Sequence, residues 1–154
     1  MKDDIKHIIN STLEFLELGS DDAASLIFAT GMAESGYRCL IQKGGGPALG
    51  FFQCEPATAI DVYNNYVAYR PKYKEKLEKL GFDIDNVKFC LVSSIAIQVA
   101  LCRLHYRRVP KALPKAGNLE AQGKYWKKYY NSELGKGTVE HFVEANHGWY
   151  GRYP

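Results

Sequence analysis

The fold is decided by the stretch FCLVSSIAIQVAL at residues 89–101, which is the most apolar part of the chain. It lies within a longer apolar segment that Asp85 or Asn86 caps and that reaches about Arg107. A helix that is apolar on all sides has to be buried, so we expect this segment to form the central helix of a helical domain. The stretch contains two serines and a glutamine and is too short to span a bilayer, so we expect no membrane insertion.

Shorter helices are predicted on both sides of this segment. Apolar residues from Ile5 to Leu16 recur at helical spacing, and Gly19 stops that run. Ser20 is suited to cap a second helix, which runs to Glu34 and ends near Gly36. The other predicted helices run from Pro56 to about Tyr66, from Lys72 to Leu80, from Asn118 to Tyr130, and from Thr138 to about Asn146 before Gly148.

The region from Tyr37 to Gly50 differs in composition from the helices around it. Residues 44–47, Gly-Gly-Gly-Pro, cannot be helical, and Ala48 to Gln53 is predicted to be a short extended segment. We therefore expect a mainly α fold, in which a helical bundle surrounds a central buried helix and carries a small Gly-rich, β-like insertion. The chain has 154 residues, which is the usual size of one domain.

Charge and cysteine content limit the function classes. The net charge is +3 and the Lys/Arg cluster from Arg103 to Lys115 is modest, whereas nucleic-acid-binding domains usually carry a denser basic stripe. We expect no nucleic-acid partner and a solvated basic face, with a helical nucleic-acid-binding or interaction module as the alternative. The four cysteines lack metal-binding spacing. We expect reduced thiols, although a disulfide between Cys39 and Cys54, which flank the candidate site, is left open.

Glu34 is the candidate catalytic residue. It stands at the end of an apolar helix, among Phe28, Ala29, Met32 and Ala33. Desolvation disfavours the charged form of a carboxyl group and raises its pKa, which suits a general acid that keeps its proton near neutral pH. The alternative is a solvent-facing or helix-capping glutamate, and the helix alone does not distinguish the two.

Two ordered motifs extend this observation. Glu34-Ser35 is followed by Gly50-Phe51-Phe52-Gln53 and then by Pro56-Ala57-Thr58-Ala59. This arrangement resembles the family-one lytic transglycosylases of the lysozyme-like superfamily, which carry a helix-ending Glu-Ser pair, then Gly-Leu-Met-Gln, then Met-Pro-Ala-Thr-Ala. The likeness is confined to residues 30–59. It implies a single catalytic domain over residues 1–154 with a lysozyme-like α+β fold, in which the insertion lies beside the active-site cleft.

The resemblance also implies roles for individual residues. Glu34 protonates the glycosidic oxygen between N-acetylmuramic acid and N-acetylglucosamine, and Ser35 orients that carboxyl group, contacts the sugar, or simply ends the helix. Gly50 allows backbone and ligand to approach closely. Gln53 offers a donor and an acceptor to an acetamido or hydroxyl group. Phe52 is expected to turn its ring towards the groove, with packing in the core as the alternative.

Glu55 departs from the methionine of the family. It is either a helix-start residue, favoured by the dipole of the helix that begins at Pro56, or the second carboxylate of a hydrolase. Asp61 is a weaker candidate for that second carboxylate.

The family's late Ala-Tyr-Asn-Ala-Gly motif has only a partial match in this chain. The closest stretch is Tyr129-Tyr130-Asn131, which no Ala-Gly follows. We expect Tyr130 and Asn131 to contact substrate, with Trp126 contributing to an aromatic wall. The tail at residues 146–150, Asn-His-Gly-Trp-Tyr, has residue types suited to a sugar groove, but packing is its expected role.

The expected function is cleavage of peptidoglycan glycan strands without metal or cofactor. A lytic transglycosylase needs only Glu34, acting as acid and then as base, and leaves 1,6-anhydromuramic ends. The alternatives are a muramidase that uses Glu34 with Glu55, and a non-catalytic wall-binding or virion structural domain. The N-terminus is unlike a signal peptide. The chain thus resembles phage enzymes made in the host cytoplasm, either an endolysin or a virion-associated enzyme, that act on the periplasmic wall as a monomer or as part of the virion.

Overall fold

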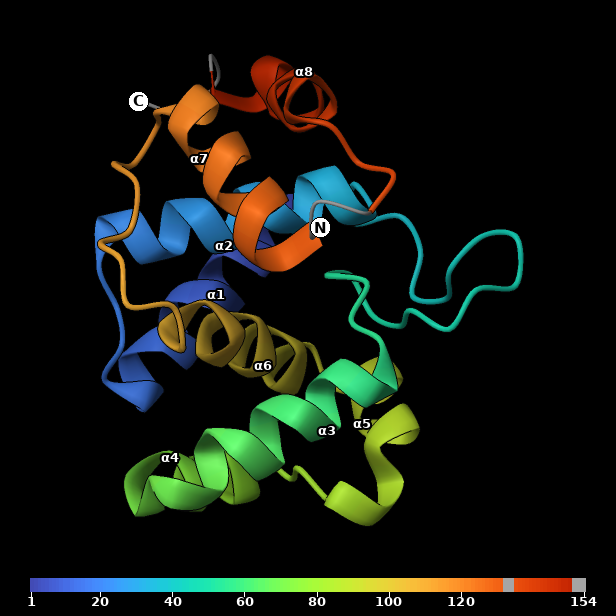
Figure 1. Ribbon diagram of the computed structural model, residues 1–154, viewed down its shortest axis with the longest axis vertical. Helices are drawn as coiled ribbons and strands as arrows, with labels where there is room; N and C mark the ends of the chain where they lie inside the picture. Colours follow the sequence, from blue (N-terminus) through green and yellow to red (C-terminus); the bar gives the residue numbers. More distant parts are fainter. Residues whose placement is uncertain (132–134, 151–154) are drawn as a thin grey trace.

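A computed structural model describes residues 1–131 and 135–150 of the chain. This part is mainly helical and contains no β-strand. Helices α7 and α8 lie at one end of the long axis, α1, α2 and α6 in the middle, and α3, α4 and α5 at the other end (Figure 1). The elements in chain order are α1 (Lys2–Leu16), α2 (Asp21–Glu34), α3 (Pro56–Asn65), η1 (Val67–Tyr69), α4 (Pro71–Lys79), η2 (Ile84–Asn86), α5 (Val87–Ser93), α6 (Ile95–Arg107), α7 (Leu119–Trp126), the π-helix η3 (Lys127–Asn131) and α8 (Val139–Tyr150).

Short polar side chains and prolines mark where several helices begin. The Ser20 hydroxyl accepts the Ala23 N–H at 3.0 Å at the start of α2, as predicted. Asn118 caps α7 in the same way. Pro56 opens α3, where its missing N–H would have no partner within the helix. These local signals place the starts of the helices that carry the candidate site.

Helix α6 is the central buried helix that the apolar pattern predicted. Nine of its residues are buried, and it contributes to two hydrophobic clusters. Val99, Cys102 and Tyr106 pack into the cluster that contains residues of α1 and α2. Ile97, Ala100, Leu101 and Leu104 pack into the cluster that contains residues of α3, α4 and α5. The helix is therefore apolar on several sides because it lies between the two clusters and packs against both of them.

The predicted long helix from Asp85 or Asn86 to Arg107 is wrong in two respects. Asn86 stands at the N-cap position of α5 but forms no capping hydrogen bond through its side chain. The chain bends by 113° between the helices on either side of Ser94. Ser94 has extended backbone angles and its hydroxyl accepts the Ile97 N–H at 3.2 Å, so it caps α6 and breaks the helix. In the described part, no single helix is long and apolar enough to cross a membrane. The segments Ile84–Ser93 and Ile95–Arg107 reach the length and apolar composition of a membrane span only when they are counted together, across the bend between them.

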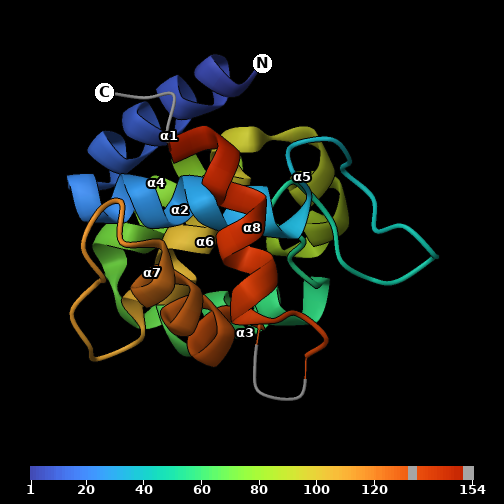
Figure 2. The same cartoon turned by 90° about the horizontal axis from the view of Figure 1, so that it is seen from above.

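The predicted extended segment from Ala48 to Gln53 is a tight turn. Leu49 and Cys54 exchange two backbone hydrogen bonds of 2.9 Å, and Gly50 and Gln53 between them have positive φ angles of 78° and 47°. Outside this pairing, the insertion contains only an isolated bridge between Ile41 and Leu49. Figure 2 shows the loop projecting from the side of the helices. The insertion is therefore β-like only in two isolated bridges.

Three predicted helix ends also differ from the structure. Helix α1 ends at Leu16 because Glu17 takes a left-handed conformation, two residues before Gly19. The α-helical geometry of α7 ends at Trp126 and continues as the π-helix η3. Helix α8 passes through Gly148 to Tyr150, because a glycine within a helix costs only about 1 kcal/mol and does not by itself end it.

Gly50 is predicted to be indispensable to this fold. A Cβ added there would lie 2.7 Å from the Leu91 carbonyl oxygen and 2.8 Å from the Gln98 side chain, at a φ that L residues avoid. We expect Gly50→Ala to lower the free energy of unfolding by about 3 kcal/mol in urea titrations, from overpacking added to backbone strain. Gly45→Ala is the matched control, because Gly45 has a φ of 82° with nothing within 4 Å, and should cost about 1 kcal/mol. Equal losses in the two variants would contradict this prediction.

Candidate functional site

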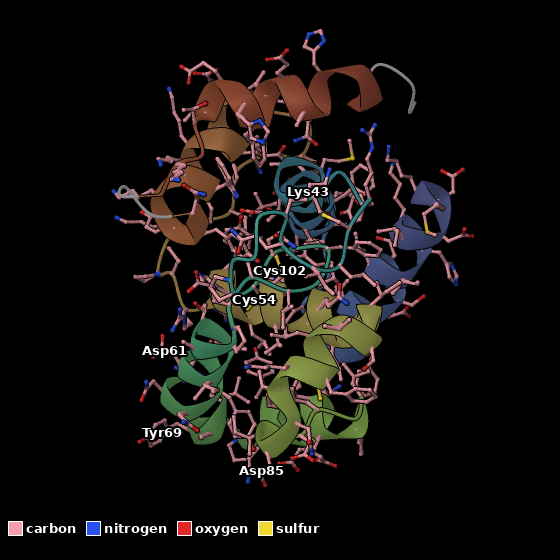
Figure 3. All side chains as sticks on the ribbon, turned by 90° about the vertical axis from the view of Figure 1, so that its right-hand side faces the viewer. Lys43, Cys54, Asp61, Tyr69, Asp85 and Cys102 are labelled. Atoms are coloured by element: carbon pink, nitrogen blue, oxygen red, sulfur yellow. The ribbon has the colours of Figure 1, made fainter. Side chains whose placement is uncertain are left out.

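A cavity of about 950 Å³ lies where the end of α2, the Gly-rich loop, the start of α3, η3 and α8 meet. Figure 3 views the molecule from the loop side, with Lys43 above Cys54 and Asp61 of α3 below it. The predicted site residues that line the cavity are Glu34, Ser35, Gln53, Glu55, Tyr130 and Asn131. Tertiary packing thus brings the two early motifs and the partial late motif to one place.

Glu34 is the last residue of α2 and is largely removed from solvent. Burial raises the pKa of its carboxyl group from 4.5 to about 7. The indole N–H of Trp126 donates a hydrogen bond of 2.9 Å to its Oε1 atom, which opposes the increase in the pKa. The pKa of this carboxyl group is therefore raised towards neutrality, as the apolar helix end predicted.

Helix α8 holds the end of α2 in place. The ring of His141 donates from Nε2 to the Ala33 carbonyl oxygen at 2.8 Å, one of the last carbonyl groups of a helix that have no partner within it. Asn146 is buried and donates to the Ala29 carbonyl oxygen at 3.1 Å. The predicted packing role of the tail is confirmed for Asn146 but is wrong for His147, whose side chain is exposed. The side chains of residues 149–150 lie outside the described part.

Ser35 of the first motif and Tyr130 of the late motif both bind backbone carbonyl groups of the second motif. The Ser35 hydroxyl donates to the Phe51 carbonyl oxygen at 2.6 Å and accepts the Tyr37 N–H at 3.0 Å. The Tyr130 hydroxyl donates to the Phe52 carbonyl oxygen at 2.6 Å. Ser35 therefore orients the loop, a role that the sequence did not predict, and Tyr130 holds the same loop from the other side.

Gly50 and Phe52 lie away from the cavity lining, which corrects two predicted contacts. The Phe52 side chain is 1% exposed and packs in the core, with its ring centroid 6.0 Å from that of Tyr37. The close approach at Gly50 is to Leu91 and Gln98. The buried Gln98 side chain accepts the neighbouring Phe51 N–H at 2.9 Å. Gly50 and Phe52 therefore face the protein interior, because Gln98 binds the backbone of the turn and the Phe52 ring packs in the core.

The two candidates for a second carboxylate differ in position. Glu55 is exposed, lines the cavity and precedes α3 without a side-chain capping bond. Asp61 lies outside the cavity lining and forms an ion pair of 2.7 Å with Arg108. The hydrogen bond from Arg108 lowers the pKa of Asp61, so this carboxylate is already neutralised by a partner. Glu55 is the one that could act with Glu34.

Some lining residues were not predicted from the sequence. His105 of α6 donates from Nε2 to the Tyr129 carbonyl oxygen at 2.9 Å, and its ring centroid lies 4.9 Å from that of Tyr130. Burial lowers the pKa of His105 to about 4, so the ring is neutral at pH 7. Thr58 of α3 also lines the cavity. Only packing across distant segments reveals these residues.

The cysteines are free thiols in the structure. Cys39 and Cys54 both line the cavity, which agrees with their predicted flanking positions. Burial raises the pKa of the Cys54 thiol to about 12, so Cys54 is protonated and is not an activated nucleophile. Among the described residues, no group of three or more His, Cys, Asp and Glu side chains could hold a metal ion.

Three cations of the basic cluster between Arg103 and Lys115 have partners in the structure. Arg103 is buried and donates to the Leu18 carbonyl oxygen at 3.1 Å. Arg108 pairs with Asp61, and Lys115 lies 3.8 Å from Asp22. Each of these three cations therefore has a partner on a different segment of the chain.

Comparison of the chain with protein-family models, with curated proteins and with solved structures gave no match. The chemistry of the cavity and the motifs that meet there therefore carry the functional interpretation.

The buried carboxyl group predicts a pH-dependent stability. Because the pKa of Glu34 is about 7 in the folded state and ordinarily 4.5, its contribution to stability is complete below pH 4.5 and is lost as the pH rises through 7. The loss should be on the order of 3 kcal/mol. We expect urea titrations to show this fall between pH 4.5 and 8 in the wild type relative to Glu34→Gln, which cannot ionise. Parallel pH profiles of the two proteins would show that the carboxyl group is solvated.

Proposed function

We propose that this chain has a lysozyme-like fold and cleaves the β-1,4 bond between N-acetylmuramic acid and N-acetylglucosamine as a lytic transglycosylase. One observation carries the proposal: a carboxyl group with a pKa of about 7 faces a cavity of about 950 Å³. That volume is in the range of sites that enclose a ligand. The meeting of the Glu-Ser and Gly-Phe-Phe-Gln motifs beside the cavity supports the same assignment.

In the first step, Glu34 acts as the general acid. Its carboxyl proton passes to the glycosidic oxygen while the bond from that oxygen to the anomeric carbon of muramic acid breaks. The N-acetylglucosamine side leaves with a new hydroxyl group, and the positive charge that develops at the anomeric carbon is stabilised by the acetamido group of the substrate. Gln53 lines the cavity. Its Nε2 donates to the Gly50 carbonyl oxygen at 2.9 Å, which leaves its Oε1 as an acceptor for a sugar hydroxyl or acetamido N–H.

In the second step, the ionised Glu34 acts as the base. It removes the proton of the 6-hydroxyl group of the same muramic acid, whose oxygen then forms a bond with the anomeric carbon. The product ends in 1,6-anhydromuramic acid, and Glu34 has regained its proton. No water is consumed, so one carboxyl group with a pKa near neutrality is sufficient for both proton transfers.

A hydrolytic muramidase is the second candidate, and the position of Glu55 favours it. This exposed carboxylate lines the same cavity as Glu34 and could activate a water molecule or stabilise the charge on the sugar. Product analysis separates the two candidates. Mass spectrometry of digested peptidoglycan should find muropeptides with anhydromuramic ends, 18 Da lighter than reducing ones, whereas reducing muramic ends alone would establish the muramidase.

The catalytic role of Glu34 is tested by substitution. We expect Glu34→Gln to keep the fold, as measured by circular dichroism, and to lose at least about 100-fold in the rate of wall lysis, because the general acid is gone. Glu55→Gln is the control for a neighbouring carboxylate, and the transglycosylase predicts that it stays within about threefold of the wild type. Lysis is followed by the turbidity of permeabilised Gram-negative cells.

These variants also address a catalytically silent wall-binding domain. If the wild type clears no cells, the enzyme proposal is wrong. If Glu34→Gln lyses cells at the wild-type rate, Glu34 is not the acid. If Glu55→Gln loses activity as severely as Glu34→Gln, the muramidase gains the support that the transglycosylase loses.

The pH dependence of cleavage follows from the same carboxyl group. Only the protonated form of Glu34 can start the reaction, and its pKa is about 7. We therefore expect kcat/KM to be highest in mildly acidic buffer and to fall about tenfold per pH unit above pH 7. A profile that stays flat up to pH 9 would exclude Glu34 as the proton donor.

A further inference from the structure

Trp126 contacts Glu34 in a way that distinguishes the two carboxyl oxygens. Its indole N–H lies 2.9 Å from Oε1. Within residues 1–131 and 135–150, no donor binds the other oxygen, Oε2. Because Glu34 lines the cavity, Oε2 is the oxygen that remains for a ligand bound there.

The indole can only donate a hydrogen bond. In the protonated acid, the carbonyl oxygen is the better acceptor, so the N–H at Oε1 favours the form with the proton on Oε2. In the ionised form, the same bond stabilises negative charge and lowers the pKa of Glu34 against the effect of burial. One contact therefore both selects the oxygen that carries the proton and opposes the effect of burial on the pKa.

The surroundings of Trp126 make it a rigid donor. The side chain is 2% exposed, and its ring centroid lies 5.3 Å from that of Phe142 on α8. Ala29 and Ala33 of α2 belong to the same cluster. A Cβ at Gly137 would lie 2.4 Å from the indole ring. The indole is thus enclosed by α2, α8 and the segment before α8, which leaves it little freedom to turn away from Glu34.

The backbone after Trp126 is also part of the site. The π-helix η3 begins at the next residue, and such turns are frequent at functional sites. Tyr129 accepts the hydrogen bond from His105, and Tyr130 donates to the loop that carries Gln53. The same short segment therefore positions the indole against the acid and the tyrosine against the second motif.

We propose that Trp126 is a positioning residue that presents Oε2 of Glu34 as the only proton-transferring oxygen, in both steps of the reaction. This inference rests on the proposed function. It deepens that function by requiring the glycosidic oxygen and the 6-hydroxyl group to approach the same carboxyl oxygen in turn. A substrate held for this geometry needs no second carboxylate on the opposite side of the sugar.

The test replaces the donor and keeps the shape. Site-specific incorporation of 3-benzothienylalanine at position 126 exchanges the indole N–H for sulfur with little change in volume. We expect the pKa of Glu34 to rise by about one unit, measured by NMR titration of the 13C-labelled carboxyl group against Glu34→Gln as the assignment control. We expect kcat to fall about tenfold to a hundredfold with KM unchanged, and the alkaline limb of the activity profile to move to higher pH.

Leu77→Ala is the matched stability control. Leu77 of α4 is fully buried in the cluster that contains residues of α3, α5 and α6, away from the indole, so this substitution should lower the unfolding temperature and leave both the Glu34 titration and the alkaline limb in place. If the benzothienyl variant titrates and turns over like the wild type, the positioning role is wrong. It is also wrong if Leu77→Ala moves the alkaline limb as far as the benzothienyl variant does.

The two proposals fail in different ways. Wild-type protein that cleaves no peptidoglycan overturns the proposed function, whatever the titrations give. A normal wild-type activity combined with an unshifted Glu34 titration in the benzothienyl variant overturns only the role of Trp126. The NMR titration needs no turnover, so the link between the indole and the carboxyl group is decided in either case.

Discussion

The candidate site depends on one constraint: the carboxyl group of Glu34 has to be shielded from water and still face a cavity. Ending α2 at this residue places the carboxyl group at the boundary between core and cavity. The packing of α7 and α8 against α2 then supplies the shielding, with Trp126 and Phe142 in contact beside Ala29 and Ala33. A carboxyl group with this burial keeps its proton to near neutral pH, whereas the same residue in an isolated helix would ionise near its ordinary pKa.

The central helix α6 contacts all three segments that surround Glu34. Gln98 holds the turn of the second motif through the Phe51 N–H, and His105 contacts η3 through the Tyr129 carbonyl oxygen. Tyr106 shares a hydrogen bond of 2.8 Å with Thr30 of α2, which is fully buried. A single helix therefore touches the loop, η3 and the helix that carries Glu34. Because buried hydrogen bonds of this kind are costly to leave unmade, the relative positions of the three segments are tightly specified.

The parts of the structure that could be predicted are those set by neighbours in sequence. The helix starts at Ser20 and Pro56 follow from capping and from the geometry of proline. The burial of α6 follows from its density of apolar residues. The break at Ser94 was not predicted, because an apolar run on both sides of it fits one long helix. In the structure the chain bends by 113° there, and residues of α5 and α6 pack into the same hydrophobic cluster. The turn at residues 50–53 was likewise not predicted from the sequence, since the contacts that hold it come from the distant residues Leu91 and Gln98.

The same division holds for the candidate site. Glu34 and its two neighbouring motifs stand out in the linear chain because desolvation at the end of an apolar helix and the order of the motifs are local properties. By itself, the sequence determined that the chain is mainly helical, where several helices begin, and that Glu34 was the carboxyl group to consider. Only the tertiary structure decided that Trp126 binds Glu34, that Ser35 holds the loop and that Phe52 packs inward. These outcomes depend on which distant side chains fill the same small volume, and no local spacing encodes that choice.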